Sequence, residues 1–112
     1  MNRFNKLPQF KKEFLKLSKK HPSLSGDLKN IEKLIALNPT GIGVNFATIY
    51  HSNKVEIVKA RLACRSLINK SIRIVYAYHQ GSFVFTHIEI YLKGDKKDNE
   101  DRKRIEDYIK NH

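Results

Sequence analysis

Residues 55–63 (VEIVKARLA) and 71–79 (SIRIVYAYH) decide the fold of this 112-residue chain. In both stretches apolar residues recur at every second position, which predicts β-strands that each have an apolar face. The opposite faces of these two strands carry Lys59, Arg61 and Arg73. The two stretches therefore predict a sheet with one face for a core and basic side chains on the other.

Two more strands extend the predicted sheet. Residues 45–50 (NFATIY) are linked to the first stretch by HSNK, and residues 83–92 (FVFTHIEIYL) follow the second stretch after QGS. Short polar or glycine-containing links of this kind are typical of β-hairpins. We therefore expect four strands joined by short antiparallel connections.

Apolar residues at three- and four-residue spacing predict helices on both sides of the strands. One such stripe runs over residues 7–21 and ends before Pro22, because the residue before a proline disfavours helical angles. A second runs over residues 23–38, and a last helix is expected over residues 98–111. The first six residues fit either a short edge strand or a frayed end.

These elements predict a single α+β domain over residues 1–112. Its N-terminal αα-hairpin precedes a four-stranded, mainly antiparallel sheet, and a C-terminal helix closes the chain. We expect the helices to cover the apolar face of the sheet. The other face would then be open to solvent or to a ligand.

The chain carries a net charge of +11, from 22 Lys and Arg against 11 Asp and Glu. Most of this excess belongs to the N-terminal helices and the central strands, since residues 91–112 are nearly balanced. So large an excess repels itself, and a polyanionic partner explains it: nucleic acid, an acidic protein or anionic lipid.

The single cysteine, Cys64, excludes an internal disulfide and a cysteine-only zinc site. It falls in an apolar stretch, so we expect a buried and inert thiol. The sequence has neither a signal-peptide pattern nor the roughly 20 apolar residues of a membrane helix. We therefore expect a cytoplasmic protein with no membrane partner.

The second face of the predicted sheet gathers residues that could carry chemistry. By strand alternation it collects a basic set and a proton-transferring set: Lys59, Arg61, Arg73, His87, Glu89, Tyr91 and Lys93. Each of these residues alone would be ordinary on the open face of an antiparallel sheet. Three cations on adjacent strands repel one another, however, and together they suit a bound phosphodiester.

The chemistry predicted for this face is RNA cleavage without a cofactor. The sequence shows no carboxylate cluster for magnesium and no zinc-ligand spacing. A ribonuclease of this kind activates the ribose 2′-hydroxyl, stabilises the phosphorane and protonates the leaving oxygen. A lysine crowded by arginines can act as the base, because its pKa is lowered. The proton donor stays open among His87, Glu89, Tyr91 and Lys96.

The order of several short motifs resembles the RelE/ParE superfamily of type II toxins. Lys59-x-Arg61 followed by residues 71–76 (SIRIVY) is similar to the paired central strands of RelE-type toxins. Residues 90–100 (IYLKGDKKDNE) resemble the segment that leads into their closing helix. Residues 8–14 (PQFKKEF) and 21–24 (HPSL) fit their helical hairpin, so the resemblance spans roughly residues 7–110.

This resemblance implies a ribosome-associated mRNA endoribonuclease that inhibits translation and is silenced by a cognate antitoxin, which we expect to be acidic or to carry an acidic segment. The resemblance also implies that mRNA and the ribosome bind on the second face of the sheet and next to it. The predicted catalytic residues are Lys59, Arg61, Arg73, Lys96 and Tyr91. The predicted RNA-binding residues are Lys54, Arg65, Lys70, Lys93 and His87.

Two other functions stay open. A non-catalytic RNA- or ribosome-binding module on the same fold would need the same cations. RelE-type toxins often carry a tyrosine in the closing helix where this chain has Asp98, Asn99 and Glu100, which favours that alternative. A ParE-type gyrase inhibitor is the third possible function, and Lys59, Arg61 and Arg73 count against it.

Overall fold

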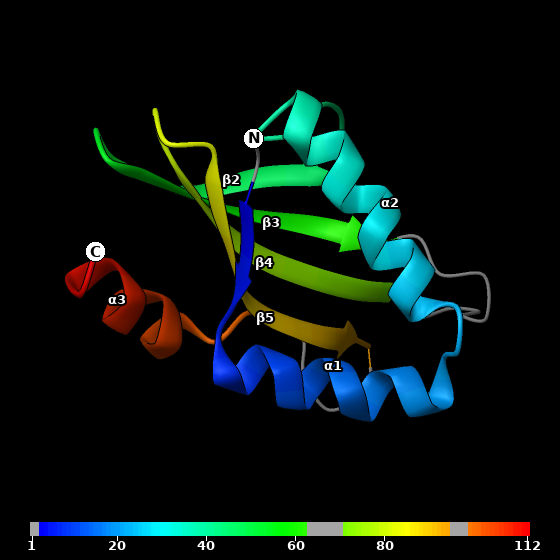
Figure 1. Cartoon of the computed structure of the whole chain (residues 1–112). Coiled ribbons are helices and arrows are strands. Elements are labelled where there is room, and N and C mark those ends of the chain that lie inside the picture. Colours follow the sequence, from blue (N-terminus) through cyan, green and yellow to red (C-terminus); the bar gives the residue numbers. More distant parts are fainter. Residues whose placement is uncertain (1–2, 63–70, 95–98) are drawn as a thin grey trace.

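The computed structural model describes residues 3–62, 71–94 and 99–112, and in these residues three helices surround one five-stranded mixed sheet (Figure 1). The strands lie in the order β1-β5-β4-β3-β2. The elements are β1 (Arg3–Lys6), α1 (Pro8–Lys20), α2 (Leu24–Leu37), β2 (Phe46–His51), β3 (Val55–Leu62), β4 (Ser71–His79), β5 (Val84–Lys93) and α3 (Arg102–Lys110).

The α+β class and the four predicted strands are confirmed, with β2, β3, β4 and β5 paired antiparallel in sequence order. The prediction of a four-stranded sheet is wrong, because β1 adds a fifth strand that pairs parallel with β5. Phe4 of β1 stacks on its register partner Phe85, with ring centroids 4.8 Å apart. Of the two possibilities for the first six residues, the short edge strand is confirmed, since β1 is the outer strand of the sheet.

The first face of the sheet carries the larger core, under α1 and α2. Phe10 of α1 and Leu24 and Ile35 of α2 are fully buried against it. The two helices follow each other as predicted, but they diverge and pack mainly on the sheet, α1 along β5 and α2 toward β3 (Figure 1). None of the helices in the described part of the chain is long and apolar enough to cross a membrane.

The second face carries a smaller core, under α3. Ile105 and Tyr108 of α3 cover Ile57 and Val75 of the central strands. The expectation that all helices lie on one face is therefore wrong, because half of the second face is also apolar and needs cover. The helix begins at Arg102, later than predicted, since the Asp101 carboxylate caps it by accepting from the Arg104 N–H at 3.1 Å.

A β-bulge in β5 changes which side chains share a face. Val75 pairs with Glu89, but its neighbour Tyr76 pairs with His87, so Ile88 is an extra residue. Because side chains alternate along a strand, the extra residue moves His87 away from the face of Glu89. The second face thus loses a histidine that strict alternation assigns to it.

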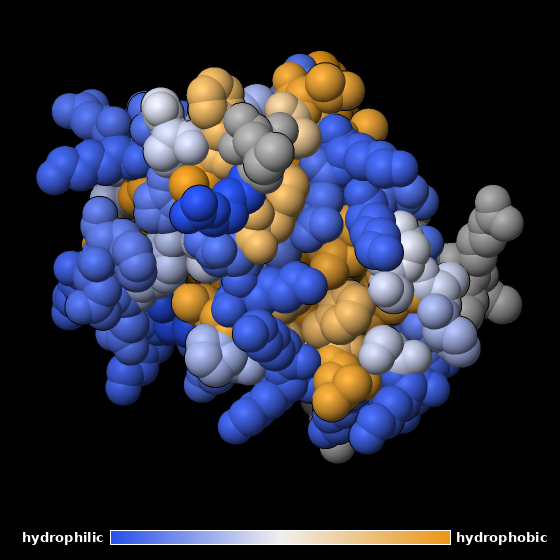
Figure 2. Space-filling view, in the orientation of Figure 1, coloured by the Kyte–Doolittle hydropathy of each residue, from blue (hydrophilic) through white to orange (hydrophobic). Residues whose placement is uncertain are grey.

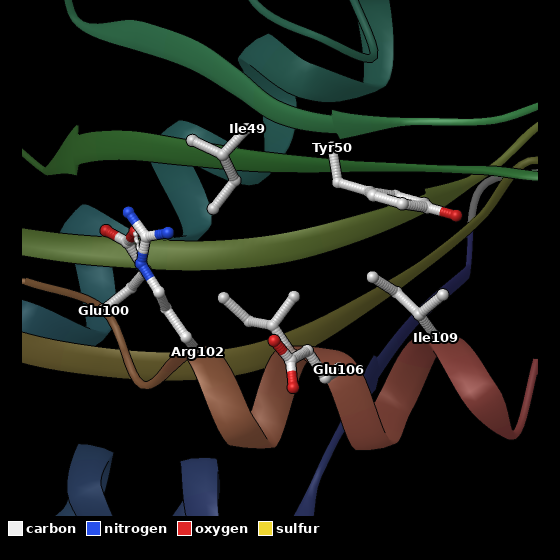
Figure 3. A pocket seen from close by; sticks show the side chains of 7 residues that line it. Ile49, Tyr50, Glu100, Arg102, Glu106 and Ile109 are labelled. Carbon is white, nitrogen blue, oxygen red and sulfur yellow. Dashed lines mark ion pairs between the residues drawn. The ribbon is translucent and has the colours of Figure 1, made fainter.

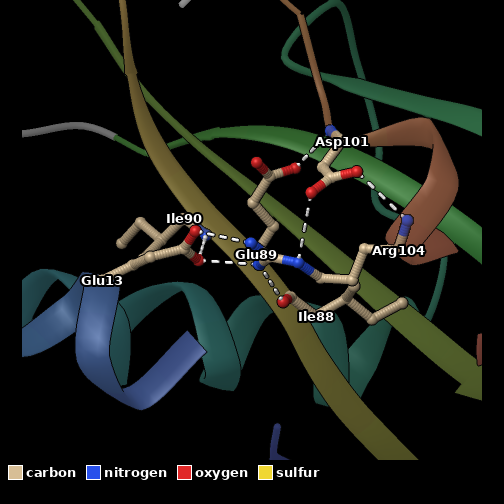
Figure 4. Close-up of polar contacts among 6 residues, drawn as sticks. All are labelled: Glu13, Ile88, Glu89, Ile90, Asp101 and Arg104. Carbon is tan, nitrogen blue, oxygen red and sulfur yellow. Dashed lines mark hydrogen bonds and ion pairs between the residues drawn. The ribbon is translucent and has the colours of Figure 1, made fainter. Parts of the chain in front are cut away.

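Side chains cap the part of β5 that β1 does not reach (Figure 4). The Ile88 carbonyl accepts a hydrogen bond from Arg104 at 2.9 Å, and the Ile90 N–H donates to Glu13 at 3.3 Å. Arg104 also donates twice to the Glu13 carboxylate, at 2.9 and 2.8 Å. The pair satisfies edge groups that could otherwise join another strand, and it ties α1, β5 and α3 together.

The C-terminal end of α3 contacts His79 of β4, and this contact should make the stability of the fold depend on pH. His79 is hydrogen-bonded to the Tyr108 hydroxyl, and burial and the nearby His112 lower the pKa of His79. As the pH falls from about 7 toward 5, the unfolded chain takes up a proton at this residue before the folded chain does, so stability decreases. Denaturant midpoints measured across this range should fall less steeply for His79→Gln. Equal slopes for the two proteins would contradict the expectation.

Candidate functional site

Three residues form one row on the second face, near the end of β3, the start of β4 and the end of β5. Arg61 and Arg73 are open to solvent, but Tyr91 is only 5% exposed and belongs to the apolar cluster that α3 covers. In the register of the sheet, Arg61 lies directly opposite Arg73, and Arg73 lies directly opposite Tyr91. The predicted grouping of these three residues on one face is confirmed. Because the backbone pairing fixes this row, it does not depend on the conformation of a loop.

Neighbouring rows extend the site in both directions along the strands. Lys59 and Glu89 flank Val75 in one row, and Lys93 lies opposite Ser71 in the row on the other side. The Arg73 Nε donates to the Ser71 hydroxyl at 3.2 Å, which fixes the guanidinium near the middle of the face. We call Lys59, Arg61, Arg73, Tyr91 and Lys93 the cationic face.

The cationic face places like charges next to each other. Arg61 and Arg73 are directly opposed, although like charges in this arrangement destabilise a sheet. Arg61 and Lys93 are exposed and Arg73 is half-buried, so all three can be reached from solvent. A bound anion would relieve the repulsion between the two arginines.

A carboxylate that strand alternation could not reveal enters this cationic face. Glu100, just before α3, accepts a hydrogen bond from the Lys59 ammonium at 3.0 Å, and its side chain is only 7% exposed. Burial opposes its ionisation, but hydrogen bonds from the backbone and Lys59 and the nearby Arg102 outweigh it, so its pKa is lowered. Sequence reasoning missed Glu100, since it belongs to no strand.

Tyr91 is the acid–base group of the row. Burial raises the pKa of its phenol, the Glu100 carboxylate raises it further, and Arg73 acts in the opposite direction. The phenol is therefore protonated at neutral pH and can donate a proton.

Glu89 is on the predicted face but serves the backbone. Its side chain is fully buried, and its carboxylate accepts from the Asp101 N–H at 2.7 Å (Figure 4). This bond holds the chain that leads from Glu100 into α3. Glu89 thus positions the segment that carries Glu100.

A shallow cleft of about 380 Å³ adjoins the site, between β2 and α3 (Figure 3). Its walls combine apolar side chains, Ile49, Ile105 and Ile109, with Tyr50 and the exposed carboxylate of Glu106. Glu100 and Arg102 stand at the end nearest the cationic face. Glu100 is therefore shared between the cleft and the cationic face.

The prediction that His87 binds RNA from this face is wrong. The bulge in β5 turns it under the helices, where it is fully buried between the rings of Phe4 and Phe10, at centroid distances of 5.7 and 5.1 Å. Its Nε2 lies 2.8 Å from the Glu32 carboxylate. His87 is a core residue.

Lys54 lies away from the cationic face. It belongs to the turn between β2 and β3, beside Val55, which pairs with His79 at the far end of β4. Four further residues singled out from the sequence fall outside the described residues: Cys64, Arg65, Lys70 and Lys96.

The wider surface is strongly polar. Hydrophilic side chains cover most of the view in Figure 2, with apolar side chains in small patches between them. One such patch lies at the top of the view, over the end of α2 and the loop after it, where Leu37, Ile42 and Val44 are exposed. Among residues 3–62, 71–94 and 99–112, no three His, Cys, Asp or Glu side chains are grouped to hold a metal ion.

The chain matches no protein-family model and no curated protein. The resemblance to RelE-type toxins therefore stays a prediction from the motifs alone.

Proposed function

We propose that this protein is a toxin-type endoribonuclease that binds translated mRNA on its cationic face. The observation that carries the proposal is the row of Arg61, Arg73 and Tyr91 across three neighbouring strands. Two guanidinium groups that solvent can reach, with a protonated phenol buried beside them, suit a phosphodiester that gains negative charge during cleavage.

The proposed roles follow from position. Arg73, at the centre of the row and hydrogen-bonded to Ser71, would stabilise the phosphorane, and Arg61 would bind the same phosphate from the adjacent strand. Tyr91 would protonate the 5′-leaving oxygen once bound RNA reaches its buried hydroxyl, which is protonated at neutral pH, and the proton of the attacking 2′-hydroxyl would pass to solvent. Lys59 and Lys93 would bind neighbouring phosphates.

The proposed regulator is an antitoxin with acidic segments. A protein of charge +11 attracts such a partner, and the cleft between β2 and α3 offers apolar walls to its side chains. A partner seated there would lie beside Glu100 and the cationic face. It would block RNA by occupying the same surface.

Binding to single-stranded RNA tests the cationic face. Each phosphate contact contributes about −0.7 to the slope of log affinity against log salt, so four basic contacts predict a slope of roughly −3. Lys93→Ala should make the slope shallower by about one contact. Lys54→Ala is the matched control, because Lys54 lies at the far end of the sheet, and its slope should stay that of the wild type.

Expression in cells tests the cleavage itself. Induced wild-type protein should arrest growth and cleave translated mRNA, and Lys59→Ala combined with Arg73→Ala should do neither. If the double variant arrests growth as strongly as the wild type, the cationic face is the wrong site. RNA binding without any cleavage would instead identify a non-catalytic RNA- or ribosome-binding module.

A further inference from the structure

Glu100 places a negative charge beside the basic side chains of the cationic face. Its carboxylate lies 3.0 Å from the Lys59 ammonium and 3.8 Å from the Arg102 guanidinium. The side chain is nearly enclosed, whereas Arg102 is 82% exposed. A glutamate in a loose surface ion pair would have a far more exposed side chain than Glu100, which is 7% exposed.

The surrounding structure holds Glu100 in place from both sides. The next residue, Asp101, donates its N–H to the buried Glu89 carboxylate and caps α3 with its own side chain. Asp101 is also 3.6 Å from Arg104, which is fixed on Glu13. The backbone that carries Glu100 is therefore anchored to β5 and to α3.

The Glu100 carboxylate accepts from Lys59 the hydrogen bond that an RNA phosphate could accept. Carboxylate and phosphate oxygens accept the same charge-assisted hydrogen bonds from lysine and arginine. Glu100 also raises the pKa of the Tyr91 phenol, after burial, which is the larger cause.

We infer that Glu100 is a built-in competitor that occupies the Lys59 subsite of the cationic face until an RNA phosphate displaces it. This inference rests on the proposed function. Its consequence is that the free protein binds RNA more weakly than its cations allow. Productive binding needs the glutamate side chain to rotate away from Lys59.

Two properties favour competition over a role for Glu100 as the proton acceptor. Its lowered pKa makes it a weak base at neutral pH. Its nearer oxygen is also already engaged by Lys59. A carboxylate that stays ionised and paired with a cation is suited to fill a phosphate subsite.

The test compares two variants of the full chain that remove the same charge. Glu100→Gln removes the competitor, and Glu106→Gln removes an exposed carboxylate of α3 that lines the same cleft. The probe is a single-stranded RNA oligonucleotide with 2′-O-methyl riboses, which cannot be cleaved through the 2′-hydroxyl. Glu100→Gln should bind it about five- to tenfold more tightly than Glu106→Gln does.

A second comparison ties the gain to Lys59. In a Lys59→Ala background, Glu100→Gln should no longer tighten binding, because the subsite that Glu100 occupies is gone. Thermal midpoints identify a variant that has lost its fold. Glu100→Asp, whose shorter side chain reaches Lys59 less well, then serves in its place and should give a smaller gain.

The outcomes separate the two proposals. If the wild type binds the RNA and Glu100→Gln binds it no better than Glu106→Gln, competition is wrong and the cationic face stands. If Glu100→Gln leaves affinity unchanged but abolishes cleavage of ordinary RNA, Glu100 is a proton acceptor and competition is again wrong. If no protein in the set binds the oligonucleotide, the proposed function itself fails.

Discussion

Replacing Arg73 with alanine is expected to lower the rate of RNA cleavage by about 10²- to 10³-fold, the usual effect of removing one donor that stabilises transition-state charge. Arg73 is the only residue of the row that lies directly opposite both Arg61 and Tyr91. The measurement is single-turnover cleavage of mRNA on translating ribosomes. Lys103→Ala, an exposed charge on α3, is the control and should change the rate little.

The same substitution should leave the stability of the protein within about 1 kcal/mol of the wild type. Removing Arg73 relieves its repulsion with Arg61, which is worth up to about 1 kcal/mol for opposed charges on a sheet, and loses one hydrogen bond to Ser71. Chemical denaturation measures this. A large loss of stability that accompanies the loss of cleavage would show that Arg73 supports the fold, against our assignment.

Replacing Arg104 with alanine is expected to have the largest effect on stability, a loss of about 3 kcal/mol. Its side chain is 13% exposed and makes a two-bonded pair with Glu13. The substitution leaves that carboxylate with the Ile90 N–H but without its two bonds from Arg104, and it removes the Arg104 donor from the Ile88 carbonyl. Denaturant unfolding measures the loss.

Two further variants show which part of the Arg104 contact matters. Arg104→Lys keeps the charge but cannot form two parallel bonds to Glu13, so its stability should be intermediate. Arg102→Ala should cost less than about 1 kcal/mol, because Arg102 is 82% exposed. If Arg104→Ala were as mild as Arg102→Ala, the side-chain cap on the edge of β5 would contribute nothing.

Most of the cationic face could be predicted from the sequence. The alternation along residues 55–62 and 71–79 places Lys59, Arg61 and Arg73 on one face whatever the rest of the chain does. Tyr91 joins them because it lies beyond the bulge of β5, where the alternation is regular. Position on a strand face is a local property, and local patterns report it.

The prediction that His87 lies on the second face was wrong, because the extra residue of the bulge moves the earlier side chains of β5 to the opposite face. Nothing in the sequence near Ile88 marks the bulge, which forms where β5 must bend between its partner β1 and the cap of Glu13 and Arg104. The parallel pairing of β1 was likewise hidden, since it joins residues about 80 positions apart.

The sequence by itself determined the α+β class, the order of helices and strands, and the row of basic side chains, because periodicity and charge act over a few residues. Only the tertiary structure decided that α3 covers half of the second face, that His87 is buried on Glu32, and that Glu100 meets Lys59. These three features depend on contacts between distant segments. The basic residues of the cationic face therefore follow from the alternation along single strands, while the carboxylate that pairs with Lys59 comes from 41 residues further along the chain.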